Sequence, residues 1–131
     1  MKKLQLPLAV FAILILAGCG NNGRIVYAVD ELADRAVADK EAFMGKEVVV
    51  SGYVAVILPN VDSNGYRLSL DFDLRSPTER QISCAIPQGK APDGISSKWV
   101  TVKGQIANIH SQNYMGLKSV TLDPCEITST E

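Results

Sequence analysis

The chain has 131 residues, of which 47% are hydrophobic, and its 13 basic and 14 acidic residues give a formal net charge of −1 at pH 7. This length suits one domain with its own core and leaves no room for a second. Because the charge is nearly balanced, the chain has no general electrostatic attraction to phosphate backbones.

The N-terminal residues have the order of parts found in a bacterial secretion signal. Two lysines follow Met1, an apolar run extends from Leu4 to Leu16, and small residues precede Cys19. The apolar run is shorter than the roughly 20 residues that a transmembrane helix needs, and a polar stretch follows it. We therefore expect residues 1–18 to be a cleaved signal peptide; the alternative is a buried core helix that ends in a cysteine.

The segment Leu16-Ala17-Gly18-Cys19 resembles the lipobox of bacterial lipoproteins. The resemblance implies that Cys19 is acylated and anchors the mature protein in a lipid bilayer, where two or more acyl chains hold firmly. Gly20 follows the cysteine, which in Gram-negative bacteria resembles the pattern of lipoproteins forwarded to the outer membrane. The expected location is therefore the cell envelope, at the periplasmic face of the outer membrane.

Cleavage would leave 113 residues with a net charge of −3, since Lys2 and Lys3 are removed. In this mature chain we expect residues 19–28 to be a lipidated, polar tether, because its glycines and asparagines have little to bury. The expected domain covers residues 29–127, and residues 128–131 are a C-terminal tail.

An amphipathic helix is predicted over residues 30–44, where the apolar positions have helical spacing. Asp30 can cap its start, and Gly45 stands where helices usually end. The apolar positions are Val29, Leu32, Ala33, Ala36, Val37, Phe43 and Met44.

After Lys46 the hydrophobic period becomes that of β-strands. In the first run, residues 48–57, one face carries Val48, Val50, Gly52, Val54 and Val56. In the second run, residues 66–74, the apolar residues lie on one face and the acidic and polar residues lie on the other. Residues 88–97 are rich in glycine and proline and form a predicted loop. The five predicted strands are residues 48–57, 66–74, 82–86, about 99–109 and about 117–122, the last of which ends before Pro124.

Residues 48–57 and 100–109 resemble each other and carry a glycine at the same place, Gly52 and Gly104. A glycine in mid-strand indicates a sharp bend or a bulge. Five strands, two of them long and bent in this way, are what a small closed barrel requires, and closure removes exposed strand edges.

Two cysteines, Cys84 and Cys125, remain after Cys19, and the expected compartment is oxidising in Gram-negative cells. A disulfide between them would close a loop of about 40 residues and contribute on the order of 4 kcal/mol. The alternative is two separately buried thiols. We expect no metal site, since two distant cysteines and His110 do not make a ligand set.

The predicted helix, the strand Val48–Gly52, the strand Val100–Gly104 and both cysteines together resemble the tRNA-anticodon-like OB-fold domain family over roughly residues 29–127. The resemblance implies a mainly β, five-stranded Greek-key OB-fold barrel with one N-terminal amphipathic helix, and it supports the disulfide. The family name reflects kinship with the anticodon-binding domain of aminoacyl-tRNA synthetases, and fold kinship does not carry function.

OB-folds usually bind along the second and third strands, where nucleic-acid binders carry aromatic and basic residues. The outward positions of these predicted strands offer no aromatic residue. Arg67, Arg75 and Arg80 could form a modest basic cluster, but next to acidic residues of the same segments a solvated face is the more ordinary interpretation. Nucleic acid is therefore not the expected partner.

Tyr53, Tyr66 and Tyr114 could frame a ligand groove near the loops, since a tyrosine has a flat apolar face and a polar tip. The alternative is that they cover the rim of the barrel. Trp99 is expected at the rim or in the core, and His110 in a surface loop.

No catalytic residue and no cofactor is expected, since no hydrolase motif, Walker loop or metal-binding helix occurs. Asp71 and Asp73 point the same way on a strand, but on an exposed face they would be solvated carboxylates without a shifted pKa. We expect a non-enzymatic, lipid-tethered module that contacts an envelope protein or glycan. Oligonucleotide binding is the second hypothesis, and an enzyme is the third.

Overall fold

The computed structural model describes residues 25–59, 64–71, 79–112 and 116–131. The expected signal peptide, residues 1–18, and the expected lipidation site, Cys19, lie outside the described residues. Within the described ranges, no helix combines the length and the apolar character needed to cross a membrane.

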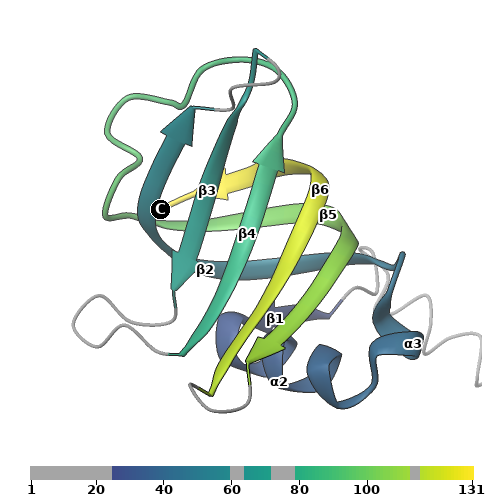
Figure 1. Cartoon of the computed structure of the whole chain (residues 1–131). Helices are drawn as coiled ribbons and strands as arrows, with labels where there is room; N and C mark the ends of the chain where they lie inside the picture. Colours follow the sequence, from purple (N-terminus) through teal and green to yellow (C-terminus); the bar gives the residue numbers. More distant parts are fainter. Residues whose placement is uncertain (1–24, 60–63, 72–78, 113–115) are drawn as a thin grey trace, which may run out of the picture.

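Five strands close into a barrel (Figure 1). The strands follow one another in the order β2, β3, β4, β6, β5, and β2 also pairs with β5, which closes the sheet. Within the barrel every neighbouring pair is antiparallel except β4 and β6. This topology is that of an OB-fold, so the predicted fold class is confirmed. The strands are β2 Glu47–Pro59, β3 Tyr66–Asp71, β4 Arg80–Ile86, β5 Trp99–Gln112 and β6 Leu117–Thr130.

A sixth, short strand, β1 Val26–Ala28, runs parallel to Val49–Ser51 of β2. β5 pairs with β2 from Glu47 to Tyr53 along one edge, and β3 pairs with β2 only from Tyr53 onward. β1 therefore covers the part of the second edge that β3 does not reach. The last three residues of the expected tether, 19–28, thus belong to the sheet.

Two short helices, and not one long helix, follow β1. α2 spans Val29–Ala38 and α3 spans Lys40–Phe43. The predicted helix 30–44 is broken at Asp39, whose carboxylate accepts a hydrogen bond from the Ala42 amide and caps α3. A short acidic side chain that bonds the following backbone competes with helix continuation. The predicted cap, Asp30, lies inside the first turn of α2, which has no side-chain cap.

The core fills the barrel, and α2 packs its apolar side, including Leu32 and Ala36, against it. Full burial of one leucine or isoleucine side chain contributes about 1.5–3 kcal/mol. Since the inward positions of all five barrel strands contribute, the core is continuous. Its largest fully buried residues include Leu32, Leu68, Leu70, Ile82, Ile95, Ile106 and Leu122.

The two strands that resemble each other in sequence pair with each other, and Gly104 shows why a glycine is needed. A Cβ on Gly104 would lie 2.8 Å from Leu122 Cβ and 2.8 Å from the Pro124 carbonyl oxygen. The ladder between β5 and β6 shifts register next to Gly104, which confirms the predicted irregularity there. β2 and β5 pair in a symmetric register, in which the glycine of each strand lies opposite a valine of the other. The pairs are Val48–Gly104, Val50–Val102 and Gly52–Val100.

β6 is longer than predicted. The sequence indicates a strand that ends before Pro124 and a tail over residues 128–131, but β6 continues to Thr130 and pairs with β5. Between the pairs Gly104–Cys125 and Ile106–Leu122 the register shifts, so Asp123 and Pro124 fall in a bulge. A proline is tolerated there because no ladder hydrogen bond needs its missing N–H.

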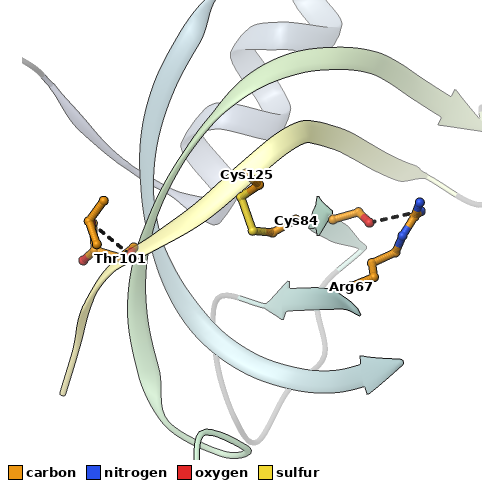
Figure 2. Close-up of a disulfide and its surroundings, with 6 residues drawn as sticks. Arg67, Cys84, Thr101 and Cys125 are labelled. Carbon is orange, nitrogen blue, oxygen red and sulfur yellow. Dashed lines mark hydrogen bonds between the residues drawn. A yellow bond between two sulfur atoms is a disulfide. The ribbon is translucent and has the colours of Figure 1, made fainter. Parts of the chain in front are cut away.

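Cys84 and Cys125 form the predicted disulfide, with Cα atoms 5.4 Å apart. Cys84 pairs with Leu122 at the end of the ladder between β4 and β6. Beyond that point β6 continues along β5. The disulfide therefore ties β4 to the part of β6 that has diverged from it, inside the barrel wall (Figure 2).

Candidate functional site

The candidate site is the outer surface of β2, β3 and β4, where OB-folds usually bind. Leu68 and Leu70 of β3 are buried in the barrel, so the residues that alternate with them point outward. Cross-strand pairing extends these positions onto β2 and β4. We call this surface the outer face, and its rows are Leu58–Arg67–Ala85, Val56–Ser69–Ser83 and Tyr53–Asp71.

Two aliphatic side chains and one arginine are exposed at one end of the outer face. Val56 and Leu58 are 44% and 54% exposed. Arg67 lies opposite Leu58, is exposed, and donates a hydrogen bond from Nη1 to Ser83 Oγ over 3.5 Å. Figure 2 shows Arg67 directed away from the disulfide. This group can bury apolar area and pair a guanidinium with a carboxylate or a carbonyl oxygen.

Sequence alternation misses Val56 as a surface residue, because it places Val56 on one face with Val50 and Val54. The ladder between β2 and β3 shifts register between Val54 and Val56. Ile57 therefore packs against the core, and Val56 turns outward. The apolar run before Pro59 carries no local signal for this bulge.

At the other end of the outer face the side chains are buried. Tyr53 and Asp71 are each only 6% exposed, although Asp71 was expected to be a solvated carboxylate. Burial raises the pKa of the Asp71 carboxyl, and a hydrogen bond with Gln81 opposes this effect. Asp71 Oδ1 is buried without a hydrogen-bond partner among the described residues. The expectation for Asp71 is therefore wrong, while Asp73, expected beside it, lies outside the described residues.

Asp71→Asn is expected to stabilise the folded protein at pH 7 by about 1 kcal/mol, since it removes a buried, incompletely paired charge. A raised folded-state pKa contributes stability that is fully present below the ordinary value of 3.8 and is lost as the pH rises through the folded pKa. The advantage of the variant should therefore shrink as the pH falls toward about 3. Urea unfolding of both proteins across this pH range measures it. An advantage that grows on acidification would show that Asp71 is stabilised as the anion.

The predicted tyrosine groove is not formed by Tyr53 and Tyr66. Both are buried, at 6% and 7% exposure, and burial raises the pKa of the Tyr66 phenol. Tyr53 pairs with Asp71 at one end of the ladder between β2 and β3, and Tyr66 pairs with Pro59 at the other. The third member, Tyr114, lies outside the described residues.

Arg80 does not join Arg67 in a basic cluster. Arg80 lies on the same, inward side of β4 as Ile82, two residues further along the strand. Its Nε lies 2.9 Å from Asp34 Oδ1 of α2. Lys118 Nζ lies 3.0 Å from the same oxygen. Burial opposes ionisation of Asp34, but hydrogen bonds from Arg80 and Lys118 lower the pKa of its carboxyl. Arg80 therefore holds α2 on the barrel.

Along β4 the two predicted cluster members are also far apart. Arg67 lies opposite Ala85, five positions from Arg80, which corresponds to about 16 Å along a strand. Arg75, the third arginine of the predicted cluster, lies outside the described residues.

Trp99 and His110 have no role in the outer face. Trp99 begins β5 and is 38% exposed, which fits the expected place at the rim. His110 was expected in a loop, but it is a strand residue that pairs with Ser119, because β5 extends to Gln112. Its side chain is exposed.

Two of the clefts that described residues line are similar in size. One, of about 580 Å³, lies beside the connection between β2 and β3, and Ile57, Tyr66 and Ala91 contribute to its wall. The other, of about 540 Å³, lies where β4 and β6 diverge, with Ile86 and Cys125 in its wall. Among the residues that the structure describes, no three His, Cys, Asp or Glu side chains are grouped so that they could hold a metal ion.

A solved structure shares this fold. The chain is similar to a crystal structure described as a "putative nucleic acid-binding lipoprotein" from Klebsiella pneumoniae subsp. pneumoniae MGH 78578, with a TM-score of 0.57 and 11% identity. That match covers 82% of this chain and 93% of the other. A structure described as a "putative aspartyl-tRNA synthetase" from Leishmania major Friedlin has a TM-score of 0.46 and 13% identity, and the match covers 84% of this chain and 22% of the synthetase. No protein-family model and no curated protein matches the chain.

Proposed function

We propose that the protein is a lipid-anchored, non-enzymatic binding module of the bacterial envelope that takes a protein partner on its outer face. The observation that carries the proposal is the exposed group of Val56, Leu58 and Arg67 at the place where OB-folds bind. The lipobox-like segment that ends in Cys19 supports the anchor, and Gly20 supports the periplasmic face of the outer membrane.

A protein partner suits this surface better than a glycan or a nucleic acid. Sugars and bases are commonly stacked on exposed aromatic rings, and Tyr53, the aromatic residue in the described part of the outer face, is only 6% exposed. A phosphate backbone is held by several basic side chains, and Arg67 is the exposed basic residue of the three rows. Protein interfaces, in contrast, combine a buried apolar centre with arginine.

Cross-linking in intact cells tests this proposal with the full, acylated chain. We expect mass spectrometry to recover one repeatable envelope protein, and Leu58→Asp to reduce its yield at least about tenfold, as expected for a residue near the centre of an interface. Ser129→Asp is the matched control, because Ser129 is exposed on β6 and outside the outer face. Recovery of abundant bystanders alone, or equal loss in both variants, would argue against a protein site on the outer face.

Oligonucleotide binding is the second candidate. The description of the Klebsiella lipoprotein and the resemblance to the tRNA-anticodon-like OB-fold family support it. We expect purified, acylated protein in detergent to bind a fluorescent oligonucleotide weakly or not at all at physiological salt. One phosphate contact by Arg67 gives a slope of only about −0.7 in log K against log salt for a single strand. Tight binding that persists at physiological salt would favour the nucleic acid over the protein partner.

A further inference from the structure

A third cleft, of about 270 Å³, lies on the outside of the barrel, where the start of β5 meets β2 and the end of β6. The exposed group of Val56, Leu58 and Arg67 is not part of its wall. Thr101 lines this cleft, and Figure 2 shows Thr101 and Arg67 on opposite sides of the disulfide. The cleft is therefore a second candidate site, separate from the exposed end of the outer face.

Trp99 is the aromatic residue of this cleft and is 38% exposed. Val100 and Val102 are buried in the barrel, so Trp99 and Thr101, which alternate with them, share the outward side of β5. The backbone N–H of Glu131 donates a hydrogen bond to the Trp99 carbonyl oxygen over 3.0 Å, which holds the end of β6 beside Trp99. A tryptophan with this exposure can bury apolar ring surface against a ligand.

Hydroxyl groups lie next to Trp99 in the same cleft. Thr101 is the next outward residue of β5, and it lies opposite Ser51 of β2. Ser51 Oγ and Thr101 Oγ1 are hydrogen-bonded over 3.2 Å, and Ser51 Oγ lies 3.4 Å from the Val100 carbonyl oxygen. Both side chains are partly exposed. Because a hydroxyl group can donate one hydrogen bond and accept two, this pair keeps bonding capacity for a ligand.

The charge and the size of the cleft favour a small neutral ligand. Among the described residues of its wall there is no lysine or arginine, and Glu131 is the one ionisable side chain. A carboxylate repels a phosphate group but accepts hydrogen bonds from hydroxyl groups. The volume is close to the lower end, about 300 Å³, of the range of small-molecule sites. Such a cleft suits a unit of the size of one ring.

We propose that this cleft binds a neutral saccharide, with one sugar ring on Trp99 and its hydroxyl groups hydrogen-bonded to Ser51 and Thr101. A pyranose ring has apolar C–H groups on its faces and hydroxyl groups at its edge, so it matches an aromatic ring that lies next to hydroxyl side chains. The outer face lacks this combination, because Tyr53 is buried there. The protein partner of the proposed function and the saccharide therefore use different sites.

Tryptophan fluorescence measures binding at this cleft directly, because Trp99 is the only tryptophan of the sequence. The full, acylated protein is kept in a detergent without a sugar headgroup. It is titrated with cellotetraose, maltotetraose and tetra-N-acetylchitotetraose up to about 10 mM, which detects a Kd as weak as about 1 mM. We expect at least one of them to shift the emission to shorter wavelength, since a sugar ring that covers the indole excludes water from it.

Thr101→Val removes a hydroxyl group from the cleft and keeps both the shape of the side chain and the fluorescent reporter. We expect the Kd of the saccharide to rise about fivefold, as for the loss of one hydrogen bond. Thr121→Val is the matched control, because Thr121 lies on β6 opposite Asn108 and outside the cleft. Equal Kd values for the two variants would show that the hydroxyl groups do not hold the saccharide, which would overturn the proposal.

Trp99→Ala, followed by isothermal titration calorimetry, should weaken binding at least about tenfold, as expected for an aromatic residue at the centre of a binding site. Trp99→Phe keeps an aromatic ring and should retain part of the affinity, which separates the loss of the ring from a loss of the fold. The absence of a shift with all three saccharides would overturn the proposal. A shift with a single-stranded oligonucleotide and with none of the saccharides would overturn it as well.

Discussion

Replacing Gly104 with alanine is expected to lower the free energy of unfolding by about 3 kcal/mol, since overpacking a close backbone crossing displaces main-chain atoms. The added Cβ would lie 2.8 Å from both Leu122 Cβ and the Pro124 carbonyl oxygen, and 3.2 Å from Cys125 Cα. Backbone on one side and a fully buried leucine on the other cannot both move away without disturbing the ladder between β5 and β6. Urea unfolding followed by circular dichroism measures the effect.

Gly94→Ala is the control for this substitution. Gly94 has a φ of +75° and no atom within 4 Å of an added Cβ, so alanine there costs only the left-handed backbone conformation, about 1 kcal/mol. If Gly104→Ala proves no more destabilising than Gly94→Ala, then β5 and β6 do not approach each other as closely as described.

Removing the disulfide with the double variant Cys84→Ala and Cys125→Ala is expected to cost about 4 kcal/mol, because the crosslink closes a loop of about 40 residues in the unfolded chain. The two cysteines are 41 residues apart and both are buried. This is a large share of the 5–15 kcal/mol that stabilises a typical domain. The midpoint of urea unfolding should therefore fall strongly.

A reductant distinguishes the crosslink from the loss of two buried side chains. Dithiothreitol should destabilise the native protein nearly as much as the double substitution does, and it should leave the double variant unchanged. A native protein whose unfolding midpoint is the same with and without the reductant would contradict a stabilising disulfide.

The barrel could be predicted because its signals are local. β-branched residues alternate over the strands, and turn residues separate them. The sequence similarity between residues 48–57 and 100–109, each with a glycine in mid-strand, marks the two strands that pair to close the barrel. The break of the helix at Asp39 and the continuation of β6 past Pro124 could not be predicted. Each depends on which backbone N–H and C=O groups need a hydrogen-bond partner in the folded chain.

The candidate site was less predictable, because it depends on register and on distant contacts. Arg67 is on the outer face as expected, but Val56 is exposed only because the ladder shifts beside it. Arg80 is separated by 46 residues from its partner Asp34, so its sequence neighbours give no sign of that ion pair. Tyr53 was a candidate for a ligand groove, since tyrosine is amphipathic, with a place at the barrel rim as the alternative. Its burial is decided by tertiary packing.

Position-resolved photo-cross-linking in living cells tests the central claim most directly. A photoreactive amino acid replaces Leu58 on the outer face in one full-length protein and Ser129 on β6 in another. We predict that position 58 yields one envelope protein as its dominant adduct, that the adduct is absent at position 129, and that added oligonucleotide does not compete with it in membranes. The same adducts at both positions, or nucleic acid as the main adduct at position 58, would contradict a protein-binding outer face.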